Sequence, residues 1–228
     1  MAKGAPGYFT NDLFEFLTDL KEHNDRAWFA KNKTRYEAAV QTPALRFIGD
    51  AGLKLRSLSP HIVAEPKPFG GSLYRIYRDT RFSRDKSPYH THVGIHFSHD
   101  AAGKEKVHLP GYFLHLDPEE CVAYSGVWRP DGPALKAIRD AIVARPQDWK
   151  RATRSPVGLY GESLKRPPPG YDPGHPLIED LKRKDFVGKV SFRPSKVAGP
   201  GFLGEFLGAC RAMAPLNAFV AKALRVPW

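Results

Sequence analysis

The residues best suited to chemistry are concentrated in residues 75–89, which read RIYRDTRFSRDKSPY. The arginines of this stretch carry planar guanidinium groups that bind phosphate or carboxylate through two parallel hydrogen bonds. Its aspartates can orient those groups, and its lysine adds a point charge. The sequence therefore predicts a site for a small ligand that bears phosphate or carboxylate. The candidate ligand-binding residues are Arg75, Arg78, Asp79, Arg81, Asp85 and Lys86.

Three histidines follow this stretch at alternate positions. His90, His92 and His96 alternate with less polar residues over residues 89–97, which is the period of a strand with one polar and one packed face. Imidazole changes charge near neutral pH, so His90 or His92 could donate a proton if the ligand is also transformed. The candidate catalytic residues of such an enzyme are His90, His92 and Asp79. The sequence identifies neither a reaction nor a cofactor, and it leaves open whether the protein is an enzyme.

The same residues admit two other interpretations. Arginines and aspartates on neighbouring strands also form ion-pair lattices that hold a hairpin, although exposed pairs contribute only about 0–1 kcal/mol each. Alternatively, His90 and His92 could hold the metal of a hydrolase, because imidazoles two residues apart on a strand can reach one ion. No nearby cysteine or carboxylate completes a known ligand signature, so we assign no metal ligands.

The overall charge favours an anionic partner. The chain has 35 Lys and Arg residues against 24 Asp and Glu residues, which leaves a net charge of +11. Basic stretches at residues 150–154 and 182–196, with Phe186 and Phe192 placed to stack on bases, raise the alternative of a nucleic-acid-binding module. A basic surface that only faces solvent would have the same composition.

Composition also limits the class of protein. The 228 residues, of which 42% are hydrophobic and 26% charged, are typical of a globular chain with a sizeable core. No apolar run has the length of a membrane span, and the N-terminus lacks the apolar stretch of a secretory signal. We therefore expect a cytoplasmic protein without a membrane partner. The two cysteines, Cys121 and Cys210, predict free thiols rather than a disulfide framework.

The periodicity of the apolar residues predicts the elements that position the site. Helical spacing occurs around residues 13–20, 28–40 and 45–55, and Asn24 is expected to cap the second of these helices. Strands are predicted at residues 73–82 and 89–97, joined by 83–88, and then at 112–116, 122–127 and 186–192. Further helices are predicted around residues 135–142, 202–213 and 215–224, and residues 161–174 read as a loop. This order predicts an α+β fold, in which an antiparallel sheet, a meander around residues 73–127, packs with N-terminal and C-terminal helices.

A regular strand over residues 73–82 would divide the charged residues between two faces. Arg75, Asp79 and Arg81 would share the polar face with the histidines, while Ile76 and Phe82 would face the core. Arg78 would also point toward the core. It therefore needs either a bulge that redirects it or a carboxylate partner, Asp79 or Asp85.

The pattern RIxRDxRFSxDKxPY at residues 75–89 resembles the hallmark of the mainly bacterial domain-of-unknown-function family 2461. The similarity continues through Asn24-x-Arg26-x-Trp28-Phe29 and through residues 110–112, 126–130 and 164–171. The resemblance implies a single domain over residues 8–228, after a loose lead-in at residues 1–7, and it implies no particular activity or substrate. His90 stands where the family pattern usually has lysine. Histidine, like lysine, can carry a positive charge, so this position favours anion binding over metal binding.

Overall fold

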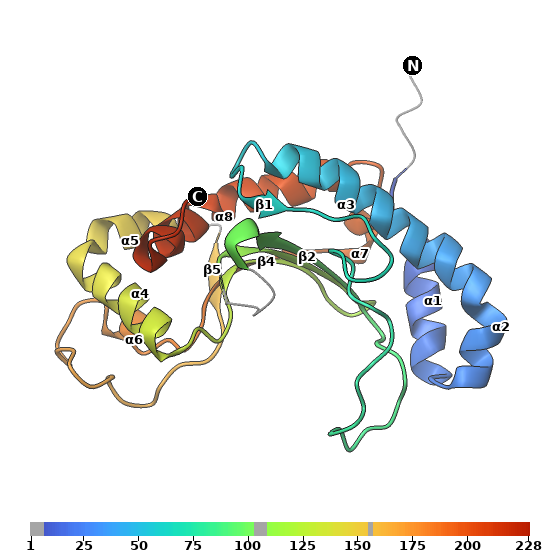
Figure 1. Ribbon diagram of the computed structural model, residues 1–228, viewed down its shortest axis with the longest axis horizontal. Coiled ribbons are helices and arrows are strands. Elements are labelled where there is room, and N and C mark those ends of the chain that lie inside the picture. Colours follow the sequence, from blue (N-terminus) through green and yellow to red (C-terminus); the bar gives the residue numbers. More distant parts are fainter. Residues whose placement is uncertain (1–6, 103–108, 155–156) are drawn as a thin grey trace.

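The computed structural model describes residues 7–102, 109–154 and 157–228. At its centre lies an antiparallel sheet with the strand order β1-β2-β3-β4-β6-β5, and helices precede and follow the run of strands (Figure 1). The strands are β1 (Ile62–Val63), β2 (Val93–His99), β3 (Gly111–Leu116), β4 (Cys121–Val127), β5 (Gly158–Tyr160) and β6 (Phe186–Phe192). The predicted α+β fold with an antiparallel sheet is confirmed.

The N-terminal helices form because their apolar residues recur at helical spacing. Helix α1 (Asn11–Glu22) buries the predicted stripe of Leu13, Phe16, Leu17 and Leu20. Helix α2 (Arg26–Tyr36) is capped by Asp25 and not by Asn24, because the Asp25 carboxylate accepts hydrogen bonds from the backbone N–H groups that begin the helix. A π-helical turn, η1 (Glu37–Gln41), then leads into α3 (Thr42–Leu55).

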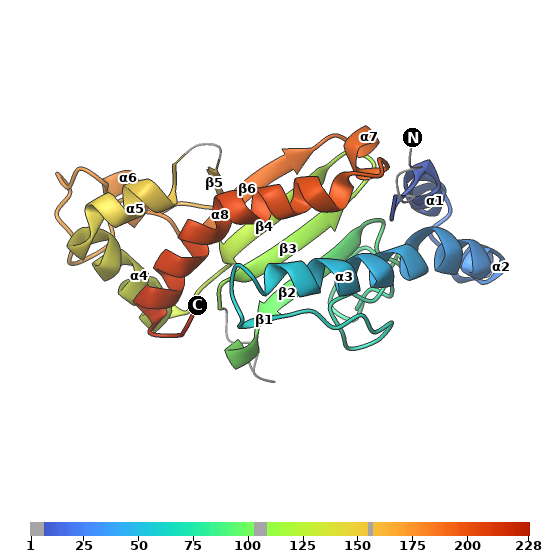
Figure 2. The ribbon, with the colours of Figure 1, turned by 90° about the horizontal axis from the view of Figure 1, so that it is seen from above.

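Helices cover one face of the sheet and leave the other open. Helix α3 and the long C-terminal helix α8 (Phe202–Leu224) lie side by side over one face, and the concave opposite face has no described helix over it (Figures 1 and 2). Strand alternation places Val93, Ile95 and Phe97 of β2 toward these helices. His96, which lies between Ile95 and Phe97, therefore faces the concave side, and so does His92, which directly precedes β2.

Helix α8 runs unbroken through Pro215, where two separate helices had been predicted. Proline in a helix interior costs about 3 kcal/mol because it removes one hydrogen bond and clashes with the preceding turn. Both halves of α8 are nevertheless buried, with Phe206 and Met213 before the proline and Leu216 and Val220 after it. The packing of both halves outweighs the local cost.

A second cluster of buried residues lies at the far end of the sheet. It includes Trp149, Phe186 and Phe219, and the helices around it are α4 (Gly132–Ala144), α5 (Pro146–Ala152) and α6 (Ile178–Leu181). The described chain also contains two short helices, η2 (Asp100–Ala102) and α7 (Pro194–Val197). Residues 161–174 contain no helix or strand, as predicted, apart from an isolated bridge at Ser163.

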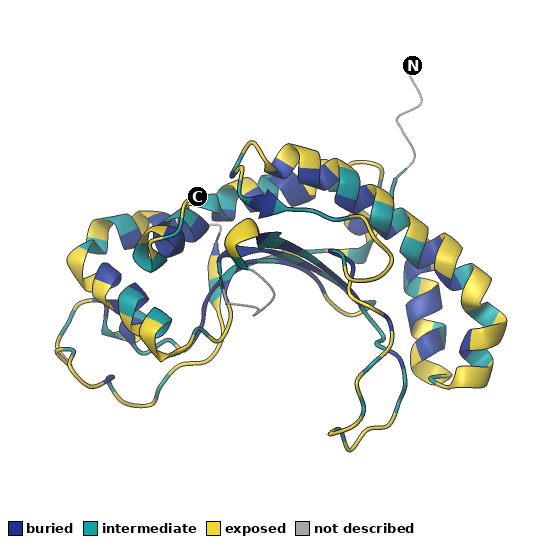
Figure 3. Cartoon of the chain, viewed as in Figure 1, coloured by how far each residue is buried: buried dark blue, intermediate teal, exposed yellow. Residues whose placement is uncertain are grey.

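Residues 73–82 do not form the regular strand that their alternation predicts. Only isolated bridges pair this segment with its partner, at Leu73 with Ile95 and at Tyr77 with Tyr89. Phe82, expected on the packed side, is 94% exposed, whereas Ile76 is buried as predicted. The segment belongs to an irregular projection, residues 70–92, which we call the arm. Figure 3 shows the exposed tip of the arm extending away from the buried sheet.

Two further observations concern the ends of the sheet and the helices. The polar composition of residues 99–106 predicts an exposed loop. His99 instead ends β2 and is buried, while residues 103–106 lie outside the described residues. In the described chain every helix is too short or too polar to span a membrane.

Candidate functional site

The arm is held against the α1–α2 turn by one side chain. Asn24 accepts a hydrogen bond from the backbone N–H of Tyr89 and donates another to the backbone O of Tyr89, each 3.0 Å long. The Tyr89 ring is buried and stacks on Phe29 of α2, with 4.2 Å between ring centroids. The second leg of the arm is thereby anchored, while backbone bonds from Arg78 N–H to Pro88 O and from His90 N–H to Ile76 O tie the two legs together.

Arg78 pairs with a carboxylate, which is one of the two outcomes that the sequence predicted. Its Nη1 lies 2.5 Å from Asp85 Oδ2 and 3.1 Å from the backbone O of Ser87. The Asp85 carboxylate also accepts hydrogen bonds from the hydroxyl and the backbone N–H of Ser87. These bonds from Ser87, followed by the one from Arg78, hold the pKa of Asp85 well below its usual value.

Arg81 and Asp79 form a second, local pair. Both Nε and Nη2 of Arg81 donate to the Asp79 carboxylate, at 3.0 and 2.7 Å, and the Arg81 backbone N–H donates to it as well. The side-chain bonds from Arg81 are the main reason that the pKa of Asp79 falls to about 2. The Arg81 side chain is 77% exposed, so this pair closes a turn at the surface.

A basic pocket of about 530 Å³ lies between the arm and the start of α2. Arg78 and Lys86 line it from the arm, and Arg26 lines it from the first turn of α2. Lys86 Nζ donates to the backbone O of Thr80, 2.9 Å away, which directs the ammonium across the loop. The one carboxylate among the lining residues is Asp25, whose oxygen is occupied in capping α2.

The structure brings together only part of the predicted ligand-binding set. Arg78 and Lys86 line the basic pocket, and Asp85 lines an adjoining cleft with Arg78. Arg75, Asp79 and Arg81 line neither space. Arg26 was not identified from the sequence as a ligand-binding residue, although it lies in the Asn24-x-Arg26 segment that carried the family resemblance.

His90 and His92 line the cleft next to the basic pocket, together with Lys21, Asn24 and Arg78. A third ring joins them, because the register of β2 and β3 places His115 opposite Gly94. The ring centroids are 5.2 Å apart for His90 and His92 and 4.7 Å apart for His92 and His115. Sequence alone gave no signal for His115, since its position depends on the pairing of two strands.

Burial disfavours the protonated form of these imidazoles. Loss of solvent around His92, followed by the charges of His115 and His90, lowers its pKa to about 4. The pKa of His90 is lowered by burial and then by the nearby charges of Arg78 and Arg75. Both rings are therefore neutral at pH 7 and can accept a proton or donate a hydrogen bond.

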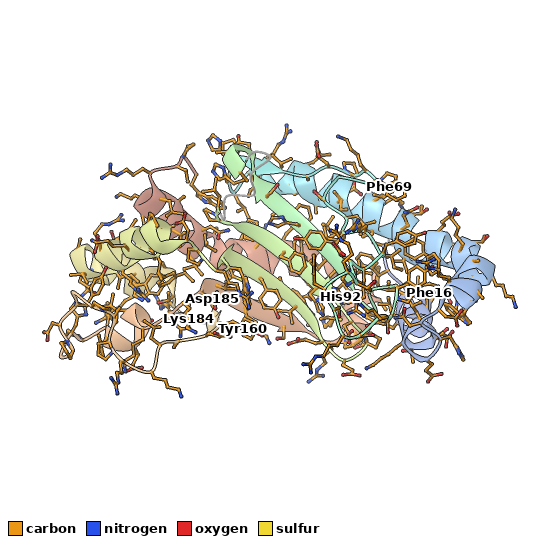
Figure 4. All side chains as sticks on the ribbon, turned by 60° about the horizontal axis from the view of Figure 1, so that its bottom comes forward. Phe16, Phe69, His92, Tyr160, Lys184 and Asp185 are labelled. Atoms are coloured by element: carbon orange, nitrogen blue, oxygen red, sulfur yellow. The ribbon has the colours of Figure 1, made fainter. Side chains whose placement is uncertain are left out.

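A second pocket, of about 350 Å³, lies farther along the concave face and is lined mostly by aromatic rings. Figure 4 shows His92 and Tyr160 toward opposite ends of this open face. The rings that line the pocket are Tyr74, His96, Phe113, Tyr124, Trp128 and Tyr160. Gly94 leaves room for two of these rings, because a Cβ at this position would lie 3.0 Å from the Phe113 ring and 3.2 Å from the Tyr74 ring.

Comparison with protein-family models matches residues 12–219 to the family described as "Conserved hypothetical protein (DUF2461)". Neither the curated proteins nor the solved structures contain a significant match to the chain. The match covers most of the chain, including α1, the arm and the whole sheet, and the description of the family assigns no reaction.

Proposed function

Since the chain belongs to the DUF2461 family, whose description gives no activity, we propose from the geometry that it binds a small ligand bearing phosphate or carboxylate in the basic pocket. One observation carries this proposal. Three cations, Arg26, Arg78 and Lys86, converge on a single pocket from two segments far apart in the sequence. The only lining carboxylate is that of Asp25, whose Oδ1 caps α2.

The ion pairs of the arm divide the predicted residues into two roles. Asp85 and the Ser87 carbonyl orient the Arg78 guanidinium, so part of its fork is positioned before the ligand arrives. Asp79 and Arg81 satisfy each other in a surface turn outside the pocket lining, so their role in the proposal is to shape the loop. Arg75 is exposed and contributes positive potential near His90.

The neutral histidines limit the chemistry that could accompany binding. An imidazole with a lowered pKa is a poor general acid at pH 7, so His90 and His92 would act as proton acceptors or hydrogen-bond donors toward the ligand. Asp79, with a pKa of about 2 and both oxygens bonded to Arg81, would remain ionised and is engaged elsewhere. Binding is therefore the core of the proposal, and any proton transfer would depend on the two histidines.

Calorimetric titration with inorganic phosphate and with pyrophosphate at low salt tests the proposal. Arg26→Gln, Arg78→Gln and Lys86→Gln should each weaken binding at least about tenfold, because each removes one charge-assisted contact. Lys136→Gln removes a cation that pairs with Asp140 on α4, outside the pocket, and should leave affinity unchanged. Absence of binding to the wild-type protein, or equal loss in Lys136→Gln, would refute the proposal.

The nucleic-acid alternative finds less support in the arrangement of the charges. Within residues 182–196, Lys182, Arg183, Lys184, Lys189 and Lys196 all pair with carboxylates. Phe186 is fully buried and cannot stack on a base, while Phe192 is half-buried and packs edge-on against Phe202. Binding to DNA or RNA remains a prediction, which a salt titration with a labelled single strand would check.

The aromatic pocket favours a second candidate function, the binding of a planar ring. Its volume suits a small ligand, and Tyr74, Trp128 and Tyr160 expose 52%, 42% and 41% of their surface. Indole and adenosine are suitable probes in saturation-transfer NMR. Trp128→Ala should reduce their signal, whereas Phe69→Ala, which removes an exposed ring outside the pocket, should not. Equal signals in both variants would remove this candidate.

A further inference from the structure

A cluster of two imidazoles and a carboxylate lies where β2 ends, whereas His92 and the arm lie where β2 begins. His99 ends β2, Asp100 follows it, and His61 immediately precedes β1. The pairing of Ile62 with His99 continues through a backbone hydrogen bond, 2.8 Å long, from Asp100 N–H to His61 O. We propose that His61, His99 and Asp100 bind a divalent transition-metal ion.

The three donors are already close enough to share one ion. Asp100 Oδ2 lies 2.9 Å from His61 Nδ1, and Asp100 Oδ1 lies 3.1 Å from His99 Nδ1. The three donor atoms lie within 4.8 Å of one another. Among the described residues, this is the one group of three His, Cys, Asp or Glu side chains whose ligand atoms lie so close together. Ligands at 2.0–2.2 Å from an ion, at right angles to each other, are separated by about 3 Å. The side chains therefore need little movement to coordinate.

The hydrogen bonds of His99 identify which of its nitrogens would bind the metal. His99 Nε2 lies 2.8 Å from the backbone O of Pro227, and a carbonyl can only accept, so Nε2 carries the proton. Nδ1 then accepts a hydrogen bond, 3.1 Å long, from the Ala101 N–H, and it is the nitrogen that an ion would bind in place of this N–H. A metal-binding histidine is usually fixed in this way, by donating its other N–H to a carbonyl or carboxylate.

His99 Nδ1 and Asp100 Oδ1 are two acceptors that lie 3.1 Å apart in the tautomer that carries its proton on Nε2. The Ala101 N–H donates to His99 Nδ1 at this point, and an ion bound to both acceptors would take its place. The parallel stacking of His61 on His99, with 5° between the ring planes, brings a third donor to the same place.

The donor set indicates the class of ion. Two imidazoles and one carboxylate suit Zn²⁺, Co²⁺, Ni²⁺ or Fe²⁺, whereas Mg²⁺ and Ca²⁺ prefer ligand shells of oxygen alone. The Asp100 side chain is 48% exposed and that of His61 is 29% exposed, so an ion could reach the site and keep water ligands. The site is separate from His90 and His92, the histidines for which the sequence raised a metal hypothesis.

Titration of untagged, chelator-treated protein with Zn²⁺ and with Co²⁺ tests the inference. The wild type should bind about one equivalent and give the visible absorption of protein-bound Co²⁺. Asp100→Asn and His61→Gln should each lower the affinity at least about tenfold and remove that absorption. His115→Gln changes a histidine of the concave-face cluster and should leave both unchanged. Failure of the wild type to bind either ion, or loss of binding in His115→Gln, would overturn the inference.

Thermal melts separate loss of the site from loss of the fold. An ion that binds only the native state raises its melting temperature, so saturating Zn²⁺ should raise the melting temperature of the wild type and of His115→Gln. Asp100→Asn keeps the shape of the side chain, and it should melt near the metal-free wild type and show no shift with Zn²⁺. An equal shift in all three proteins would mean that Zn²⁺ binds elsewhere and would refute the assignment.

Discussion

The side-chain amide of Asn24 pairs with the backbone of Tyr89 as another strand would, through two hydrogen bonds of 3.0 Å. This contact joins the α1–α2 turn to the arm across 65 residues of sequence. It places Arg26, two residues beyond Asn24, opposite Arg78 and Lys86 in the basic pocket. The anion site that we propose therefore depends on a residue that need not touch the ligand.

Replacing Asn24 with alanine should destabilise the protein by about 1–3 kcal/mol, because it leaves two partly buried backbone groups of Tyr89 without partners. Urea unfolding measures this free energy, and faster hydrogen exchange at the Tyr89 amide locates it. Asn32→Ala is a matched control, since Asn32 bonds only to a carbonyl of its own helix, that of Trp28. The effect of Asn32→Ala should stay within about 0.5 kcal/mol. Equal effects of the two variants would argue against a stabilising contact between Asn24 and Tyr89.

The Asp79–Arg81 pair should be visible in the titration of the Asp79 carboxyl. Because hydrogen bonds from Arg81 hold the pKa of Asp79 at about 2, against a reference of 3.8, the stabilisation from this pair is complete above that reference. It is lost as the pH falls toward 2. In Arg81→Gln, NMR should show the pKa of Asp79 rising toward 3.8. Arg151→Gln, on α5, should leave it unchanged, and an unchanged value in Arg81→Gln would contradict the pairing.

His92 should remain neutral well below pH 6.5, because burial and the neighbouring rings lower its pKa to about 4. The unfolded chain binds a proton at this position near pH 6.5, so the contribution of His92 to stability declines as the pH falls from 6.5 toward 4. NMR titration of the ring protons measures the pKa directly. Replacing His115 with glutamine removes a like charge and should raise the pKa of His92, whereas a drop would contradict the proposed contact.

A methyl group at position 94 should disturb the aromatic pocket. Gly94→Ala places a Cβ 3.0 Å from Phe113 and 3.2 Å from Tyr74, and overpacking of this kind costs about 1–3 kcal/mol. Gly49→Ala is the matched control, because a Cβ there has open space in the middle of α3. That change should stabilise the helix by roughly 0.5–1 kcal/mol. Urea unfolding of both variants checks the pair, and a stable Gly94→Ala would show that Tyr74 does not rest on Gly94.

Local sequence was sufficient for the elements whose periodicity matches their burial. The stripe from Leu13 to Leu20 in α1 and the alternation through Val93, Ile95 and Phe97 in β2 both appear in the structure as predicted. In these segments the apolar side chains alone specify which face meets the core. The family resemblance of residues 75–89 is confirmed by the match of the family model to residues 12–219.

The arm departs from the strand that its alternating residues predict. Asp79 accepts a hydrogen bond from the Arg81 N–H, and Asp85 accepts one from the Ser87 N–H. Such side-chain bonds compete with strand pairing for the backbone, so the arm is irregular and Phe82 is exposed.

The composition of each candidate site was decided by contacts between segments distant in sequence. Asn24 brings Arg26 to the arm, and the register of β2 with β3 brings His115 to His92. The pairing of β1 with β2 likewise brings His61 to Asp100. Sequence therefore determined the helices, most strands and the charged hallmark, because those depend on neighbouring residues. Tertiary packing determined which of those charges meet, because a site is formed by side chains from different elements.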